Sequence, residues 1–104
     1  MKPFLGMLGL CARAGKLITG EKACLQAIRS QSACVALLDG GASANAVKAM
    51  SDACTHHDIP LLRLPEGLLG AAIGKEGRMA AVVTDAGMAQ RLKALFSEGE
   101  PVTQ

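Results

Sequence analysis

Residues 9–17 partly match the sequence motif of the phosphate-binding loop of nucleotide hydrolases. In that loop, backbone N–H groups surround the phosphates, a lysine reaches them, and a Ser or Thr hydroxyl holds Mg²⁺. Here the spacing between Gly9 and Gly15 is one residue too long, and Leu17 follows Lys16 where the hydroxyl residue should stand. No strand is predicted before the segment, so nucleotide hydrolysis is not expected.

The other groups that could do acid–base or metal chemistry are His56, His57, scattered carboxylates and four cysteines. Adjacent histidines near a helix end point to different sides and more often cap and solvate the helix than act as a base. No two cysteines have the close spacing of a zinc-binding pair. We expect buried free thiols, as in a reducing cytoplasm. We predict no catalytic residue, no metal, no cofactor and no enzyme activity.

A stronger chemical signal is the turn Thr19-Gly20-Glu21-Lys22, which runs into a predicted helix and is preceded by Lys16. Backbone N–H groups at a helix N-terminus have no partner inside the helix and carry a partial positive charge, which suits a phosphate. A lysine in the first turn opposes the helix dipole, which is easier to understand if Lys22 meets a polyanion. An ordinary helix start that tolerates a lysine fits the spacing equally well.

A second candidate for anion binding is the loop formed by residues 74–78. It places two glycines and the cations Lys75 and Arg78 between a predicted helix and a predicted strand. In an α/β fold, such a loop can lie beside the start of another helix. A plain solvated turn is the alternative.

The charge of the chain is unevenly distributed. The net charge is only +2, but residues 1–38 hold five basic and one acidic side chain, which gives +4. Residues 39–104 hold six basic and eight acidic side chains, which gives −2. A local basic cluster matters more for binding a polyanion than the total charge does, although a solvated basic face would have the same composition.

The hydrophobic pattern predicts the elements that must position these residues. Continuous apolar runs of strand length indicate strands buried on both faces, and apolar residues at helical spacing indicate amphipathic helices. In the first helix we expect Leu5, Leu8 and Ala12 to share the inward face. Helices are predicted over residues 3–14, 20–30, 43–56, 65–74 and 85–96, and strands over 17–19, 33–38, 61–64 and 79–84.

Because helices alternate with short buried strands, the sequence predicts a three-layer α/β/α sandwich with a small mixed sheet of about four strands. The 104 residues suffice for one domain, which we place at residues 1–97, with a flexible tail over 98–104. Aromatic residues make up 2% of the chain, which argues against a module that stacks bases on exposed rings. No apolar run is long enough for a membrane helix, and we expect a cytoplasmic protein.

Several short motifs, in order and over most of the chain, resemble the ribosomal protein L7Ae family, and in particular its bacterial YlxQ-like group. The motifs lie between residues 4 and 96. They are Leu8-Gly9-Leu10-Cys11-Ala12-Arg13-Ala14-Gly15-Lys16-Leu17 with Gly20, Ala27-Ile28-Arg29, Ala42-Ser43-Ala44-Asn45 with Lys48, Leu69-Gly70-Ala71-Ala72-Ile73-Gly74-Lys75 with Arg78, and Thr84-Asp85-Ala86-Gly87-Met88-Ala89.

The resemblance implies a non-catalytic protein that binds kinked RNA through the start of the second helix and the loop before the last strand. By matching positions, Gly20, Glu21, Lys22, Ala23 and Gln26 fall on the family's helix motif, and residues 75–79 fall on its loop. Together with Lys16 and Thr19 of the turn described above, the residues predicted to contact RNA are Lys16, Thr19, Gly20, Glu21, Lys22, Gln26, Lys75 and Arg78. Other members carry Asn, Glu and Lys where this chain has Lys22, Ala23 and Gln26, and there the Asn and Glu read sheared G·A pairs. This chain is therefore expected to rely more on phosphate attraction.

The predicted partner is structured RNA, and ribosomal RNA on the ribosome is one possible target. We expect the protein to bind neither DNA nor a membrane. The alternative is a protein-interaction module of the same fold that has lost specific RNA binding. In that case the alanine- and glycine-rich surface of the first helix would serve as the docking face.

Overall fold

The computed structural model describes residues 2–99 and contains one mixed sheet of four strands in the order β1-β4-β2-β3. The strands are β1 (Leu17–Thr19), β2 (Val35–Asp39), β3 (Leu61–Leu64) and β4 (Ala80–Val83). β4 runs antiparallel to both of its neighbours, whereas β2 and β3 are parallel. The four predicted strands are thereby confirmed, and β1 and β3 have the predicted bounds.

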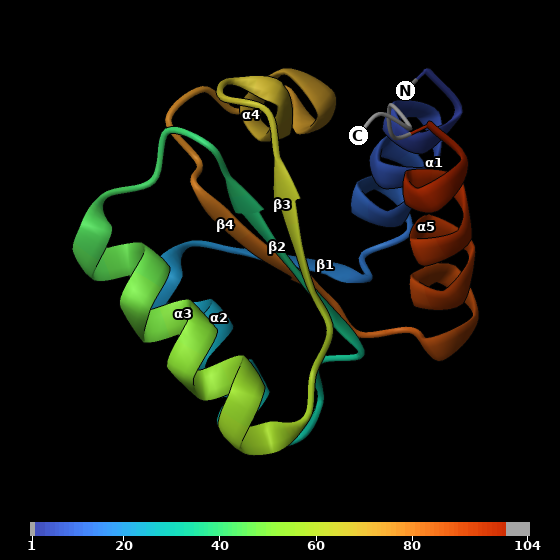
Figure 1. Ribbon diagram of the computed structural model, residues 1–104. Coiled ribbons are helices and arrows are strands. Elements are labelled where there is room, and N and C mark those ends of the chain that lie inside the picture. The colour runs from blue at the N-terminus through green and yellow to red at the C-terminus, as the bar shows by residue number, and fades with distance from the viewer. Residues whose placement is uncertain (1, 100–104) are drawn as a thin grey trace.

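Five helices cover the two faces of the sheet (Figure 1). The helices are α1 (Lys2–Arg13), α2 (Glu21–Arg29), α3 (Ala44–His57), α4 (Leu68–Ile73) and α5 (Ala86–Gly99). α1, α4 and α5 contribute to the core on one face, and α2 and α3 contribute to the core on the other. The predicted three-layer α/β/α sandwich is therefore confirmed.

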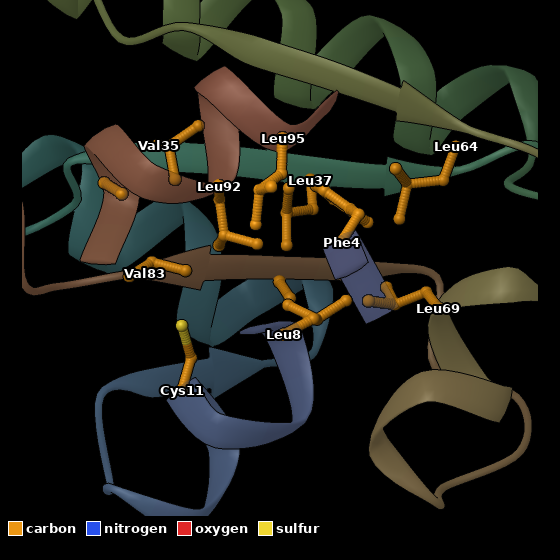
Figure 2. Packing of buried hydrophobic residues seen from close by; sticks show 12 residues of the cluster. Phe4, Leu8, Cys11, Val35, Leu37, Leu64, Leu69, Val83, Leu92 and Leu95 are labelled. Carbon is orange, nitrogen blue, oxygen red and sulfur yellow. The ribbon is translucent and has the colours of Figure 1, made fainter. Parts of the chain in front are cut away.

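The central strands β2 and β4 are buried along their whole length because each is covered by helices on both faces. On the face of α1 and α5, the core contains Phe4, Leu8, Leu92 and Leu95 (Figure 2). The opposite core is built from smaller side chains and sulfur-containing residues, among them Cys24, Ile28, Met50 and Cys54. This aliphatic core agrees with the low aromatic content.

Side chains cap the beginnings of α3 and α5. The Ser43 hydroxyl accepts a hydrogen bond from the Ala46 N–H at 3.1 Å, and the Asp85 carboxylate accepts one from the Met88 N–H at 2.9 Å. Each cap satisfies a backbone donor that has no partner inside its helix. The polar side chains that precede α3 and α5 thus define where these helices begin.

The buried face of α1 differs from the prediction. Phe4, Leu8 and Cys11 are buried, whereas Leu5 and Ala12 are only half-buried and Leu10 is 44% exposed. Nearly every residue of α1 is apolar or small, so the hydrophobic pattern does not distinguish between adjacent faces of the helix.

The last helix is longer than predicted, because α5 continues to Gly99 rather than ending near Phe96. Of the predicted flexible tail, residues 100–104 lie outside the described part of the chain. Within residues 2–99, no helix is both long and apolar enough to cross a membrane.

Candidate nucleic-acid interface

Strand pairing brings the two candidate anion-binding segments together. Thr19 at the end of β1 pairs with Ala81 of β4, and the Gly20 N–H donates a hydrogen bond to the Ala80 carbonyl oxygen at 3.0 Å. Since β1 and β4 are antiparallel, the end of β1 must lie beside the beginning of β4. The start of α2 therefore lies next to the loop that precedes β4.

Gly20 forms the contact between these two segments. It is the N-cap residue of α2 with φ +99°, a conformation that favours glycine, and no side chain caps the helix at this position. A Cβ atom at position 20 would lie 3.5 Å from Nη1 of Arg78. The Arg78 guanidinium thus lies against the N-terminus of α2, where the first backbone N–H groups of the helix are free to bind an anion.

The remaining predicted residues surround this contact. Lys75 and Thr19 line one small pocket together with residues of α1 and α4. Glu21, Lys22 and Gln26 are exposed on the outer side of α2, and Cys24 and Ile28 are buried in the core. Lys75 and Arg78 are exposed as well.

The positive charge at this interface is not neutralised by ion pairs. Among residues 2–97, the only salt bridge joins Lys48 and Asp52 on α3, at 3.0 Å. Lys22 and Arg78 therefore stand at the positive end of the α2 dipole without a salt bridge, which is unfavourable in the isolated protein, although Glu21 in the same turn offsets part of this charge. An anion at this position would remove the electrostatic penalty.

Lys16 is a predicted site residue that lies on the far side of β1 from this contact. It precedes β1 at the end opposite Gly20, about 13 Å away at the rise of an extended strand. Its carbonyl oxygen accepts hydrogen bonds from the N–H and the hydroxyl of Thr84. The described contacts thus place Lys16 beside Thr84 rather than beside the loop of residues 74–78.

Comparison with known proteins identifies the family. The model of the ribosomal protein L7Ae/L30e/S12e/Gadd45 family matches residues 4–93. The chain belongs to this family. Among curated relatives, RNA-binding protein YlxQ of Bacillus subtilis is 38% identical over 86% of this chain and 91% of that protein. RNA-binding protein YlxQ of Enterococcus faecium is 34% identical over 88% of this chain and 89% of that protein.

Solved structures of similar fold agree with this assignment. A protein of unknown function from Bacillus halodurans is 35% identical, with a TM-score of 0.86, over 90% of this chain and 96% of that chain. The 15.5kD RNA binding protein of Giardia lamblia is 17% identical, with a TM-score of 0.73, over 88% of this chain and 85% of that chain. At this low identity, the second likeness supports the fold alone.

The structure also reveals a residue of this family member that the sequence pattern did not single out as part of the site. Asp39, the last residue of β2, is 1% exposed. Burial alone would raise the pKa of Asp39, but hydrogen bonds from the N–H groups of Gly67, Gly41 and Leu69 outweigh it and hold the pKa below its usual range. The Asp-Gly-Gly sequence after the strand was the only signal for this arrangement.

The thiols and histidines are not part of the exposed interface, although Cys24 lies on α2 with its side chain in the core. The cysteines are free, as predicted, and three of them are buried. Burial, with a smaller contribution from Cys54, raises the pKa of the Cys24 thiol to about 12, which makes it a poor nucleophile. His56 and His57 lie at the C-terminal end of α3, the end opposite Ser43. Within the described residues, no group of side chains could hold a metal ion.

Proposed function

We propose that the protein binds structured RNA, without catalysing a reaction, through the start of α2 and the loop of residues 74–78. The observation that carries this proposal is the position of the Arg78 guanidinium against Gly20 at the uncapped N-terminus of α2. The relatives that are named RNA-binding proteins, at 38% and 34% identity, support the same function.

Phosphate groups provide the main contacts in this proposal. The N–H groups of the first turn of α2 would bind one phosphate, and Lys22, Lys75 and Arg78 would attract the surrounding backbone. Thr19, Gly20, Glu21 and Gln26 complete the surface, and Lys16 would contact a more distant part of the RNA. Ala23 cannot donate or accept a hydrogen bond to a base edge through its side chain, so sequence readout at this position is weak.

The RNA expected to fit this surface is a kinked helix. The surface combines cations from two chain segments that are side by side, and a kink brings phosphates of two helical arms close together. By resemblance to the family, a kink-turn or a similar kinked element, in ribosomal or another structured RNA of the cytoplasm, is the proposed target. Weak base readout further implies that other bent RNAs compete effectively with a standard kink-turn.

The salt dependence of binding tests this proposal. The probe is a synthetic RNA duplex that contains a short bulge followed by tandem G·A pairs, and its affinity is measured at several salt concentrations. In a Lys22→Ala, Lys75→Ala, Arg78→Ala triple variant, the slope of log K against log salt should fall by about 2, because each lost phosphate contact contributes about 0.7–0.9. The affinity should fall with it.

Lys48→Ala provides the matched control, because it removes one exposed cation that is already paired with Asp52. Its affinity and slope should stay close to those of the unchanged protein. An unaltered slope in the triple variant, or an equal loss in the control, would contradict the proposed interface.

A protein-interaction function remains the second candidate, and the exposure of Leu10 favours it. Leu10 is a large apolar side chain that is 44% exposed on α1, next to exposed Gly6, in the helix that the sequence indicated as a docking face. A partner retained by the tagged protein in nuclease-treated lysate, and lost in a Leu10→Lys variant, would support this function. Loss of all partners after nuclease treatment would support RNA binding instead.

A further inference from the structure

Asp39 is the one buried charged side chain among the residues whose burial is described. It stands at the end of β2, and its carboxylate has three backbone donors. Oδ2 accepts from the N–H of Gly41 and from the N–H of Gly67, both at 2.9 Å, and Oδ1 accepts from the N–H of Leu69 at 3.1 Å. Gly67 is the N-cap residue of α4, so the carboxylate attaches the start of this short helix to the sheet.

The backbone of the same residue holds the segment on the other side of the RNA-binding loop. The Asp39 N–H donates to the Met79 carbonyl oxygen at 2.8 Å, directly after Arg78. The loop of residues 74–78 therefore begins at the end of α4 and ends at Met79. Asp39 contacts both boundaries of the α4–loop segment, the first through its side chain and the second through its main chain.

The helix α4 and the loop are tightly coupled to each other. The Lys75 N–H donates to the Gly70 carbonyl oxygen at 3.0 Å, and a Cβ atom on Gly70 would lie only 3.0 Å from the Lys75 carbonyl oxygen. There is no space between the helix and the loop at this point. A displacement of α4 is therefore transmitted to Lys75 and along the loop to Arg78.

We propose that Asp39 is a positioning residue for the RNA interface, which acts by fixing α4 and thereby holding Lys75 and Arg78 beside the start of α2. The proposal rests on the proposed function, because it assigns Asp39 a role in presenting those two cations. Asp39 itself contacts no RNA. Two of its three hydrogen bonds, from Gly67 and Leu69, join segments that are far apart in the sequence, and the cations that depend on them lie on the molecular surface.

The variant Asp39→Asn tests the coupling with little change in shape. An amide keeps one acceptor oxygen but turns an NH₂ group toward one of the backbone donors, so at least one of the three hydrogen bonds is lost. The affinity for the bulged G·A RNA duplex is measured for this variant alone, combined with Lys75→Ala and Arg78→Ala, and combined with Lys22→Ala. Thermal unfolding of every variant sets an assay temperature at which all of them are folded.

A positioning role predicts a specific pattern of non-additivity. Asp39→Asn should lower the affinity about fivefold in the unchanged protein and in the Lys22→Ala background, but not when Lys75 and Arg78 are already alanine. Gly70→Ala, which pushes on the loop directly from α4 and leaves Asp39 intact, should follow the same pattern. It serves as the deciding variant if Asp39→Asn does not fold.

Two results would overturn the inference. Equal losses with and without Lys75 and Arg78 would mean that Asp39 affects binding only through general stability. Full affinity in both Asp39→Asn and Gly70→Ala would mean that the loop does not depend on α4. Failure of the unchanged protein to bind the RNA is a separate outcome, which would refute the proposed function itself.

Discussion

Charge reversal at position 22 should change stability and RNA binding in opposite directions. Lys22 is the second residue of α2, which has no side-chain cap, and Arg78 already lies against the preceding glycine. A cation in the first turn opposes the helix dipole, and a carboxylate there is favourable, each by about 0.3–1 kcal/mol. Lys22→Glu removes the first effect and gains the second, so it should stabilise the free protein by about 1 kcal/mol.

For a domain of this size, a stabilisation of about 1 kcal/mol raises Tm by roughly 4–8 °C. The increase should be measured by thermal unfolding at low ionic strength, where helix-dipole effects are least screened. The same variant replaces an attractive phosphate contact by a repulsive one and should lower the affinity for the bulged RNA duplex by tenfold or more, about 1.4 kcal/mol.

Lys48→Glu is the matched control because it makes the same change of charge on the neighbouring helix. Lys48 is paired with Asp52 at 3.0 Å, four residues away, so its reversal creates a repulsion between like charges. We expect a slightly lower Tm and unchanged RNA affinity. Either a lower Tm or an unchanged RNA affinity in Lys22→Glu would refute the hypothesis that Lys22 lowers the stability of the protein but is needed to bind a polyanion.

Two further predictions concern Gly20 and Asp39. Gly20→Ala should destabilise the fold by about 1–2 kcal/mol, because alanine is strained at φ +99°. It should also weaken RNA binding, because the new methyl group would contact Arg78. Chemical denaturation measures the first effect and RNA titration the second, and no change in either would contradict the geometry. The stability that the Asp39 carboxylate provides should be complete above pH of about 4, the ordinary value for an unfolded Asp, and should disappear as the pH falls through the lower pKa of the folded state. Comparison of the unfolding free energy of wild type and Asp39→Asn across this range tests the sign, and a difference that grows on acidification would contradict it.

The elements of the fold could be predicted from the sequence because each depends on local patterns. The apolar runs that became β2 and β4, and the capping residues Ser43 and Asp85, act within a few positions of the chain. The buried face of α1 could not be predicted because a helix with so few polar residues has several apolar faces. Packing against α5 and α4 decides which of them is buried, and packing depends on distant residues.

The candidate site was predictable in its parts but not in its assembly. The start of α2 and the loop of residues 74–78 each have a local signature of glycines and cations, yet only the pairing of β1 with β4 brings Arg78 to Gly20. The same pairing places Lys16 beside Thr84, although Lys16 is only four positions from Gly20. The side chain of Asp39 bonds to residues 28 and 30 positions away, a relation that no spacing rule detects.

Features that oppose stability meet at the start of α2. Lys22 and Arg78 stand at the positive end of a helix dipole, and Gly20 leaves that helix without a side-chain cap. By contrast, α3 and α5 begin at polar side-chain caps, and the core residues are mostly aliphatic. Local conflicts of this kind persist in natural proteins mainly where a function requires them. Their position at the start of α2 is therefore independent support, from energetics rather than from resemblance, for an anion-binding surface there.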